Sequence, residues 1–476
     1  MKLFLINPDY MTYGDPPLGL AYLAAYIREN CDFLRINILD QLNEKEILKK
    51  IKKENPSIIG FTAVSSNYSY VKELAKKIKE TFSDIILIIG GIHITTLPKS
   101  FGNSSFDIAV IGEGEICATK LIKSIKNKKG INIDELSKIK GLLFRKNKEI
   151  INTGLSETIE NLDQIPFPAR ELLNMTYYSL PRFSSDKSID PIGSLITSRG
   201  CPYSCKFCSS SRFWGTKVRF FSASRIIDEI ELLHKKYNYS HIYIYDDLFS
   251  INKIRLKEII KGLKEKEFLG KIKFSVYGRT NCLDEETAKL LNEMNVQDIT
   301  FGFETGSQKL LTFLKGNNVT IKDGINAIKL SKKYNLNPGG FFILGSPTET
   351  LEDMKKTYCF IKDNCKENFI IYQTIPFPGT YLWDYALKNK IINDSFYEEK
   401  QKEFVDINPN LILSKEISKE NFEIYFKKIN SLYPAKKKSL TNKISMIKPR
   451  HIKLILTKEF LKKTNNLKGA FLKRLS

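Results

Sequence analysis

Three cysteines within eight residues are the feature of this sequence whose residue type and spacing most directly predict chemistry. The segment CPYSCKFC places Cys201, Cys205 and Cys208 in a Cys-x3-Cys-x2-Cys pattern. Thiolates are the usual protein ligands of iron–sulfur clusters. Three of them on one loop hold three irons of a cubane and leave the fourth iron open. Gly200 and Pro202 favour the irregular backbone that wraps such a cluster.

Two other interpretations of these cysteines fit less well. A zinc site needs four ligands, commonly two paired CxxC units, and the chain has no second pair and only four histidines. Three buried cysteines without metal are disfavoured by the loop position and the glycine and proline beside them. Clustered cysteines in a chain without an export signal point to metal or redox chemistry in a reducing cytoplasm. The other five cysteines are isolated, and we interpret them as small buried side chains.

In residues 1–130, short apolar runs alternate with helical patterns. This alternation predicts a Rossmann-like, doubly wound parallel sheet. Helices are expected on both faces. Ligands of such sheets bind at the carboxyl ends of the strands, so the loops after the strands matter most. The expected strands span 3–7, 34–40, 57–63, 85–91 and 106–112.

The rest of the 476-residue chain divides into three further parts. Residues 131–190 predict a hairpin and a proline-bearing linker. Residues 191–385 repeat the strand–helix alternation six times, which predicts a partial (β/α)6 barrel of the TIM type, since eight units would be needed to close it. Residues 386–476 form a basic, helical C-terminal region. The fold class is therefore α/β with a helical end.

Beyond the cysteines, the sequence resembles the radical S-adenosylmethionine (SAM) superfamily, including the aromatic Phe207 before the third cysteine. YIYDDLFSINKIRLKEI, VYGRTNCLDEE, FGFETGSQKLL, GFFILGSPTETLEDM and PFPGTYLWDYA resemble successive blocks of its cobalamin-binding branch, which contains class B methyltransferases. PPLGLAYLAAYIREN, GGIHITTLP and VIGEGE resemble that branch's cobalamin domain. This ordered set covers residues 1 to 390 and is far more specific than any one block.

The resemblance implies a [4Fe–4S] cluster on Cys201, Cys205 and Cys208, with SAM chelated to the open iron and cleaved to a 5′-deoxyadenosyl radical. It also implies SAM contacts from residues at or near strand ends, where barrel sites gather. These residues are Phe207, Asp246, Asp247, Arg279, Glu304 and Gly345. Two structural alternatives stay open: the paired aspartates could cap a helix, and Glu304 could pair with a lysine.

For the first sheet the resemblance implies cobalamin at the strand-end loops. The candidate contacts are Tyr13, Gly14, Ser65, Ser66, Gly90, Gly91, His93, Gly112, Glu113 and Gly114. The DxHxxG motif that places a histidine on cobalt is absent, so we expect His93 to be a corrin-edge or structural residue. A degenerate Rossmann domain that no longer binds cobalamin is the rival interpretation, and fold alone does not decide between them.

The C-terminal end is strongly basic. Residues 436–476 contain 13 lysines and arginines against one acid, Glu459, in a chain of net charge +22. KPRHIKLILTKEFLKK predicts an amphipathic helix that either packs against the barrel, which we favour, or lies on anionic lipid at the inner membrane face. An acidic carrier domain is a further possible partner. Nucleic acid is disfavoured because no RNA-binding motif is present.

Together these features predict a cobalamin-dependent radical SAM enzyme that methylates an unactivated carbon of a small-molecule or lipid substrate, reduced by a flavodoxin or ferredoxin. Radical cyclisation or rearrangement within the same family is the alternative. A non-catalytic iron–sulfur and cobalamin sensor or electron carrier would not need the full set of SAM-contact blocks. Methylthio transfer to transfer RNA would need an N-terminal cysteine triad, and Cys31 and Cys117 are too few.

Overall fold

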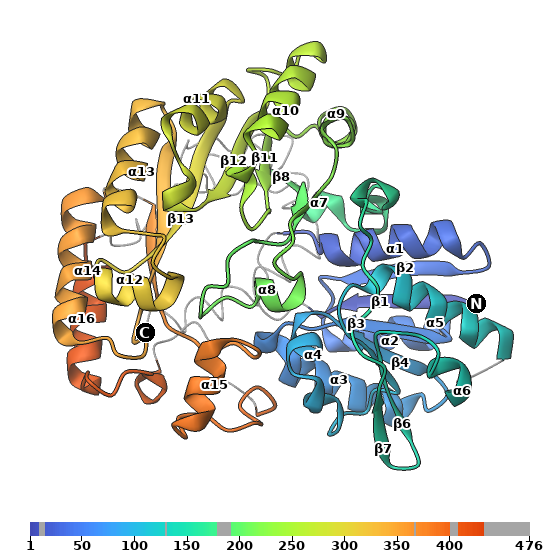
Figure 1. Cartoon of the computed structure of the whole chain (residues 1–476). Helices are drawn as coiled ribbons and strands as arrows, with labels where there is room; N and C mark the ends of the chain where they lie inside the picture. The colour runs from blue at the N-terminus through green and yellow to red at the C-terminus, as the bar shows by residue number, and fades with distance from the viewer. Residues whose placement is uncertain (9–14, 129–130, 179–191, 366–367, 400–407, 433–476) are drawn as a thin grey trace.

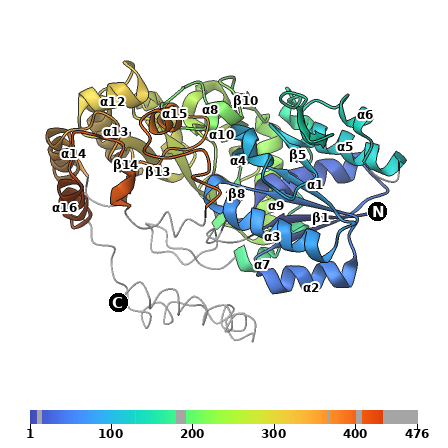
Figure 2. The same ribbon diagram turned by 90° about the horizontal axis from the view of Figure 1, so that it is seen from below.

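The computed structural model describes residues 1–8, 15–128, 131–178, 192–365, 368–399 and 408–432. Within them, two sheets with their helices lie side by side, and both views of the chain show this arrangement (Figures 1 and 2). The predicted fold class is confirmed: a Rossmann-like parallel sheet, a six-stranded partial barrel and a helical C-terminal part. No described helix has the length and apolarity that crossing a bilayer requires.

The first sheet has the strand order β2-β1-β3-β4-β5-β6-β7. Its first five strands are parallel, as predicted, and the hairpin of the last two continues it in antiparallel pairing. The strands are β1 (Lys2–Asn7), β2 (Arg35–Asp40), β3 (Ile58–Thr62), β4 (Ile86–Gly90), β5 (Ile108–Val110), β6 (Leu142–Lys146) and β7 (Glu149–Asn152).

Helices cover both faces of this sheet because each presents an apolar stripe to it. Helices α1 and α5 share one apolar core with the sheet, and α2 and α3 share the other. A capping box between Asn43 and Glu46 begins α2. The helices are α1 (Leu18–Asn30), α2 (Glu44–Glu54), α3 (Tyr68–Thr81), α4 (Ile92–Thr96), α5 (Gly114–Lys128) and α6 (Ile133–Leu136).

The second sheet is parallel throughout, in the order β15-β14-β13-β12-β11-β8. Its strands are β8 (Ile192–Leu195), β11 (His241–Ile244), β12 (Lys273–Gly278), β13 (Val296–Glu304), β14 (Asn337–Leu344) and β15 (Phe369–Gln373). The helices between them are α9 (Ala223–Tyr237), α10 (Lys253–Glu265), α11 (Glu285–Glu293), α12 (Gln308–Lys315), α13 (Ile321–Lys333) and α14 (Leu351–Asn364).

The sequence predicts the first barrel strand over the apolar run GSLITS (193–198), but β8 is shorter and ends at Leu195. After β8 the chain leaves the sheet, because the Asp246 carboxylate accepts the backbone N–H groups of Thr197 and Ser198 at 2.6 and 3.0 Å. The chain then forms β9 (Ser198–Arg199), which pairs antiparallel with β10 (Arg219–Phe220). Between these short strands lie the cysteine segment and helix α8 (Ser210–Phe213), near the centre of Figure 1.

Short helices complete the described chain. Helix α7 (Met175–Tyr178) precedes the barrel, and α15 (Tyr381–Lys388) and α16 (Lys419–Asn430) follow it. Helix α15 forms a small apolar cluster with Leu97 of the first domain, and Phe207 of the cysteine segment packs against that cluster. The predicted amphipathic helix of the basic end lies outside the described residues.

Candidate functional site

The cysteine segment forms a loop between β9 and α8, and its three thiols are half-buried and unbridged. Gly200 enters the loop with φ of +101°, and a Cβ there would lie 2.5 Å from the Lys217 carbonyl oxygen. Only glycine fits such a backbone. The Cys208 N–H then donates to the Cys205 carbonyl at 3.1 Å, which curls the chain between the last two cysteines.

Donor groups approach the sulfurs of Cys205 and Cys208. Arg279 Nη1 lies 3.1 Å from the Cys205 sulfur, and the Ser210 N–H lies 3.5 Å from the Cys208 sulfur. Burial raises the pKa of Cys208 to about 11 and also raises that of Cys201. The free thiols of Cys201 and Cys208 are therefore protonated at neutral pH, and they would have to lose their protons to bind iron.

The loop fits a cluster better than a single ion. Among the described side chains, no three His, Cys, Asp or Glu stand close enough to ligate one metal ion. A cubane binds each thiolate through a different iron, so its ligands need not converge on one point. Unbridged thiols with N–H donors beside them match that requirement.

The paired aspartates after β11 have different environments. Asp246 is buried, and besides the two backbone N–H groups it accepts the hydroxyls of Thr197 and Ser198 at 2.5 and 2.6 Å. It therefore holds the segment that leads into the cysteine loop. Asp247 accepts the Ser210 hydroxyl at 2.5 Å, next to that loop. Burial raises the pKa of the Asp247 carboxyl above its usual value.

Arg279 and Glu304 are linked through one lysine. Arg279 Nη2 donates to the Lys315 carbonyl at 3.2 Å, and the Lys315 ammonium pairs with Glu304 at 3.0 Å. Gly345 ends the β14 segment, and its N–H donates to the Glu349 carboxylate at 2.6 Å. Burial raises the pKa of Glu349 to about 8.

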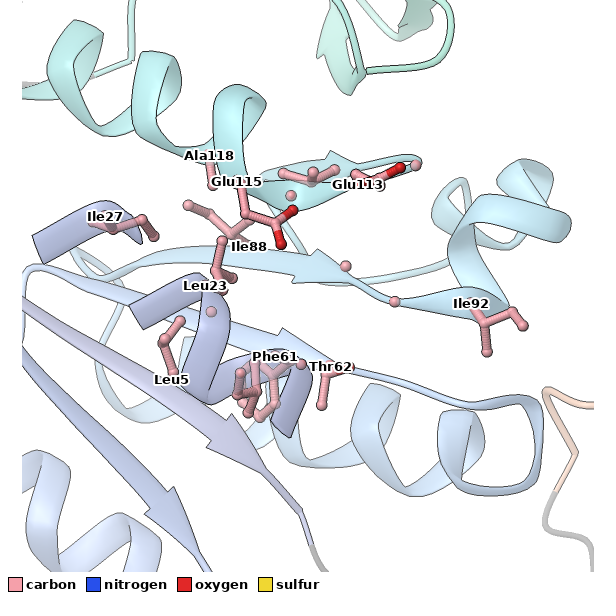
Figure 3. Close-up of a pocket in the computed structure, with 18 of the residues that line it drawn as sticks. Leu5, Leu23, Ile27, Phe61, Thr62, Ile88, Ile92, Glu113, Glu115 and Ala118 are labelled. Carbon is pink, nitrogen blue, oxygen red and sulfur yellow. The ribbon is translucent and has the colours of Figure 1, made fainter. Parts of the chain in front are cut away.

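A cavity of about 270 Å³ lies in the first domain, between α1, α5 and the sheet (Figure 3). Figure 3 shows Leu23, Ile27 and Ala118 gathered around the strand that carries Ile88. Five predicted cobalamin contacts line this cavity: Gly90, Gly91, Gly112, Glu113 and Gly114. An apolar pocket of this size with glycine backbone at its rim suits the apolar part of a ligand whose amide groups stay at the rim.

Three other predicted contacts do not line the cavity. His93 is fully buried, and its ring nitrogens lie 3.1 Å from the Ser65 hydroxyl and 3.2 Å from the Ser100 hydroxyl. Its ring stacks on Tyr68, with centroids 3.9 Å apart, and burial lowers its pKa to about 3. Ser66 is half-buried in the same turn. Tyr13 and Gly14 lie outside the described residues.

The sequence interpretation missed residues that connect the cavity with the cysteine loop. Arg199 reaches the Glu113 and Glu115 carboxylates at 2.7 and 2.6 Å, and Phe213 and Trp214 also line the cavity. Two sequence signals were available: an arginine directly before Gly-Cys, and a second acid in the GEGE segment. Neither signal identifies its partner, because the partners are 84 and 86 residues apart.

Two family models match the chain. The radical SAM superfamily model matches residues 195–361, and the B12-binding domain model matches residues 13–122. These matches imply a [4Fe–4S] cluster, SAM and cobalamin as cofactors. The radical SAM match includes the cysteine loop, and the B12-binding match includes most of the residues that line the cavity.

Similar proteins agree with these models. An uncharacterized methyltransferase of Pyrococcus horikoshii is 34% identical over 407 residues, covering 82% of this chain and 84% of the relative. The anaerobic magnesium-protoporphyrin IX monomethyl ester cyclase of Cereibacter sphaeroides is 26% identical over 377 residues, covering 75% and 59%.

The solved structure of the radical SAM methyltransferase TsrM from Kitasatospora setae, with cobalamin and a [4Fe-4S] cluster bound, has the same fold. Its TM-score is 0.65 at 17% identity, covering 94% of this chain and 89% of that one. Family models match both domains, in the same order along the chain, and the Pyrococcus horikoshii relative is 34% identical over 82% of this chain. The chain therefore belongs to the family of cobalamin-binding radical SAM enzymes.

Proposed function

We propose that this protein is a methyltransferase that uses SAM and cobalamin to methylate an unactivated carbon of a small-molecule or lipid substrate. The observation that carries the proposal is the methyltransferase relative, which is 34% identical over 82% of this chain. The cavity in the cobalamin domain supports it, because residues next to the cysteine loop help to line that cavity.

We assign roles to the site residues that their positions support. Cys201, Cys205 and Cys208 hold the cluster, and Asp246 fixes the segment that leads into their loop. The SAM side is formed by Phe207, Asp247, Arg279, Glu304 and Gly345. The glycine rim of the cavity faces cobalamin, together with Glu113. Ser65, Ser66 and His93 act as support behind that rim.

When bound, the cluster with SAM supplies a 5′-deoxyadenosyl radical, and cobalamin supplies a methyl group. The chain then has to present an apolar carbon and exclude competing donors. Tyr243 lies 4.7 Å from Tyr245 and 5.3 Å from Tyr277 between ring centroids, near the carboxyl ends of β11 and β12. Tyr372 of β15 is 50% exposed. These rings offer a surface for an apolar substrate.

The electrons come from a partner of the flavodoxin or ferredoxin type. The half-buried cysteines leave the loop accessible to such a donor. We place the reaction in a reducing compartment such as the cytoplasm, because all the described cysteines are unbridged. No described residue supports the predicted membrane contact.

A radical cyclase is the second candidate, and the cyclase relative at 26% identity is the observation that favours it. Both candidates share the cofactors and the radical step. They differ in whether a methyl group leaves SAM for the substrate.

Anaerobic reconstitution with iron, sulfide and hydroxocobalamin tests the proposal. We expect about four irons and one cobalamin per chain. With a reductant and methyl-deuterated SAM, 5′-deoxyadenosine should form, and candidate substrates are screened for the labelled methyl group. Cyclised product without label would favour the cyclase. Cofactor binding without any SAM cleavage would instead indicate a sensor or electron carrier, and Cys205→Ala is the control for cluster-independent cleavage.

A further inference from the structure

Four buried charged residues join the cavity to the cysteine loop. Glu113 and Glu115 belong to the cavity side, and Arg199 and Arg219 belong to the strands that flank the loop. Arg199, two residues before Cys201, donates from Nη1 to Glu113 at 2.7 Å and from Nη2 to Glu115 at 2.6 Å. The arginine and both glutamates are buried, and all three line the cavity. The guanidinium fork thus spans two carboxylates at the start of α5, just after strand β5.

A second arginine completes the charge balance. Arg219 stands opposite Arg199 in the β9–β10 pair, contacts the Glu113 carboxylate and donates to the Ile159 carbonyl at 2.7 Å. Two cations and two anions are therefore buried together as a neutral group. Removing one partner from such a group leaves a buried charge uncompensated, which is strongly unfavourable.

The other side of the loop also reaches the cavity. Phe213 and Trp214 follow the third cysteine and line the cavity beside Arg199, whose guanidinium lies 5.1 Å from the Trp214 ring centroid. At the start of the same short helix, Ser210 contacts the Cys208 sulfur and the Asp247 carboxylate. Both ends of the cysteine loop are thus attached to walls of the cavity.

Resting on the proposed function, we propose that Arg199 is a positioning residue that fixes the cluster loop against the cobalamin cavity, so that cluster assembly and cobalamin binding strengthen each other. Cobalamin in the cavity orders the Glu113–Glu115 rim and, through Arg199, the first cysteine. The cluster, in turn, would order Cys201 and, through Arg199, the Glu113–Glu115 rim. Because coupling between two binding sites is reciprocal, each cofactor raises the affinity for the other by the same factor.

The test measures that factor directly. Hydroxocobalamin is titrated anaerobically into the full-length apoprotein and into the same protein after cluster reconstitution, with the absorption change as the signal. We expect the cluster to tighten cobalamin binding by about tenfold in the wild type, within the usual range of such couplings. Arg199→Lys keeps the positive charge but loses the second nitrogen that lets the guanidinium contact both carboxylates. In this variant the coupling factor should fall close to one.

The matched control is Arg170→Lys. Arg170 pairs with Glu229 at 2.7 Å, and both side chains are as buried as Arg199, but neither lines the cavity. The control should keep the wild-type coupling factor. Glu115→Gln removes one of the two negative charges that Arg199 contacts, and serves as the second variant if Arg199→Lys does not fold. It should lower the coupling in the same way.

A second readout uses the cluster itself. Cobalamin should shift the electron paramagnetic resonance signal of the reduced cluster in the wild type and in Arg170→Lys, but not in Arg199→Lys. Normal binding of both cofactors with a coupling factor of one in the wild type would overturn this inference and leave the proposed function standing. Full coupling in Arg199→Lys would overturn it too. A wild type that binds no cobalamin would overturn both proposals.

Discussion

Arg279, directly after β12, holds its Nη1 atom 3.1 Å from the sulfur of Cys205. The same guanidinium lies 3.9 Å from the ring centroid of Tyr203, and its Nη2 binds the Lys315 carbonyl. These contacts fix one positive charge beside the sulfur of Cys205, which we propose to be a ligand of the cluster. A fixed charge at that distance affects how readily the cluster accepts an electron.

Replacing Arg279 with glutamine should therefore lower the reduction potential of the cluster while leaving its iron in place. We expect a shift of roughly 60 mV toward negative values, which for one electron is a tenfold change in the equilibrium. Redox titration followed by electron paramagnetic resonance measures it. Lys206→Gln is the matched control, because its ammonium lies over the rings of Phe313 and Tyr381 instead. Equal shifts in both variants would contradict a specific role for Arg279.

Each cluster cysteine should be indispensable for iron binding. Cys201→Ala, Cys205→Ala and Cys208→Ala should each reduce the reconstituted iron from about four per chain to a small fraction of that number. Iron analysis and the absorption of the sulfide-to-iron bands report the loss. Cys282→Ala is a demanding control, since that thiol lies 3.2 Å from the Tyr203 hydroxyl within the same region. Loss of iron in the control alone would reassign the ligand set.

Gly19 tests the cavity without disturbing the core. It lines the cavity from the first turn of α1, and no atom lies within 4 Å of the position that a Cβ would occupy. Gly19→Ala should leave cobalamin binding intact and stabilise the helix by about 0.5–1 kcal/mol. Gly19→Leu should be as stable but should weaken cobalamin binding by about tenfold or more, a loss of about 1.4 kcal/mol.

Thermal unfolding and cobalamin titration of the two Gly19 variants separate these effects. Equal cobalamin affinity in the leucine and alanine variants would show that the cofactor binds elsewhere. A lower melting temperature in both variants would instead contradict the open space beside this glycine.

His93 should make the fold sensitive to acid. Its pKa is lowered to about 3 by burial, whereas an unfolded histidine titrates near 6.5. The unfolded state therefore binds more protons between these values, so stability is complete above about pH 6.5 and falls as the pH decreases toward 3. At pH 5 the loss from this one residue is roughly 2 kcal/mol.

Chemical denaturation at pH 7 and pH 5 measures this loss, and His93→Gln should flatten the pH dependence by that amount. An unchanged pH dependence in the variant would mean that the imidazole is not buried in its neutral form. The same burial predicts that reduced cobalamin on this protein shows no nitrogen coupling from His93 in its paramagnetic resonance spectrum.

The strand and helix pattern could be predicted from the sequence because it is local. The apolar patterns of LGLAYLAAYIREN, EKEILKKIKKE, ASRIIDEIELLHKKY and VQDITFGFE predict three helices and a strand at the residues where the structure has α1, α2, α9 and β13. The cysteine triad could be predicted for the same reason, since its signal lies within eight residues. Where a contact between distant segments decides the backbone, prediction failed: the strand expected over 193–198 is interrupted because Asp246 takes two of its N–H groups.

The charged group at the cavity shows the same limit. The acids of GEGE look like turn residues in isolation, and β9 and β10 have two residues each, too few to show any periodicity. Only the folded chain brings Arg199 and Arg219 to Glu113. His93 is a comparable case, because its partners Ser65 and Ser100 come from two different loops.

The two glutamates at the cavity lie far along the chain from their arginine partners, and this separation affects when the ion pairs can form during synthesis on the ribosome. All strands of the first sheet have been synthesised once residue 152 is complete. Glu113 and Glu115, at the rim of the cavity, can form their ion pairs only after Arg199 and Arg219 have been synthesised, 84 to 106 residues further along the chain. Until Arg199 emerges, both carboxylates remain hydrated, and the nascent first domain has an acidic, incomplete edge. Joining of the two halves is therefore a late event in the synthesis of the chain.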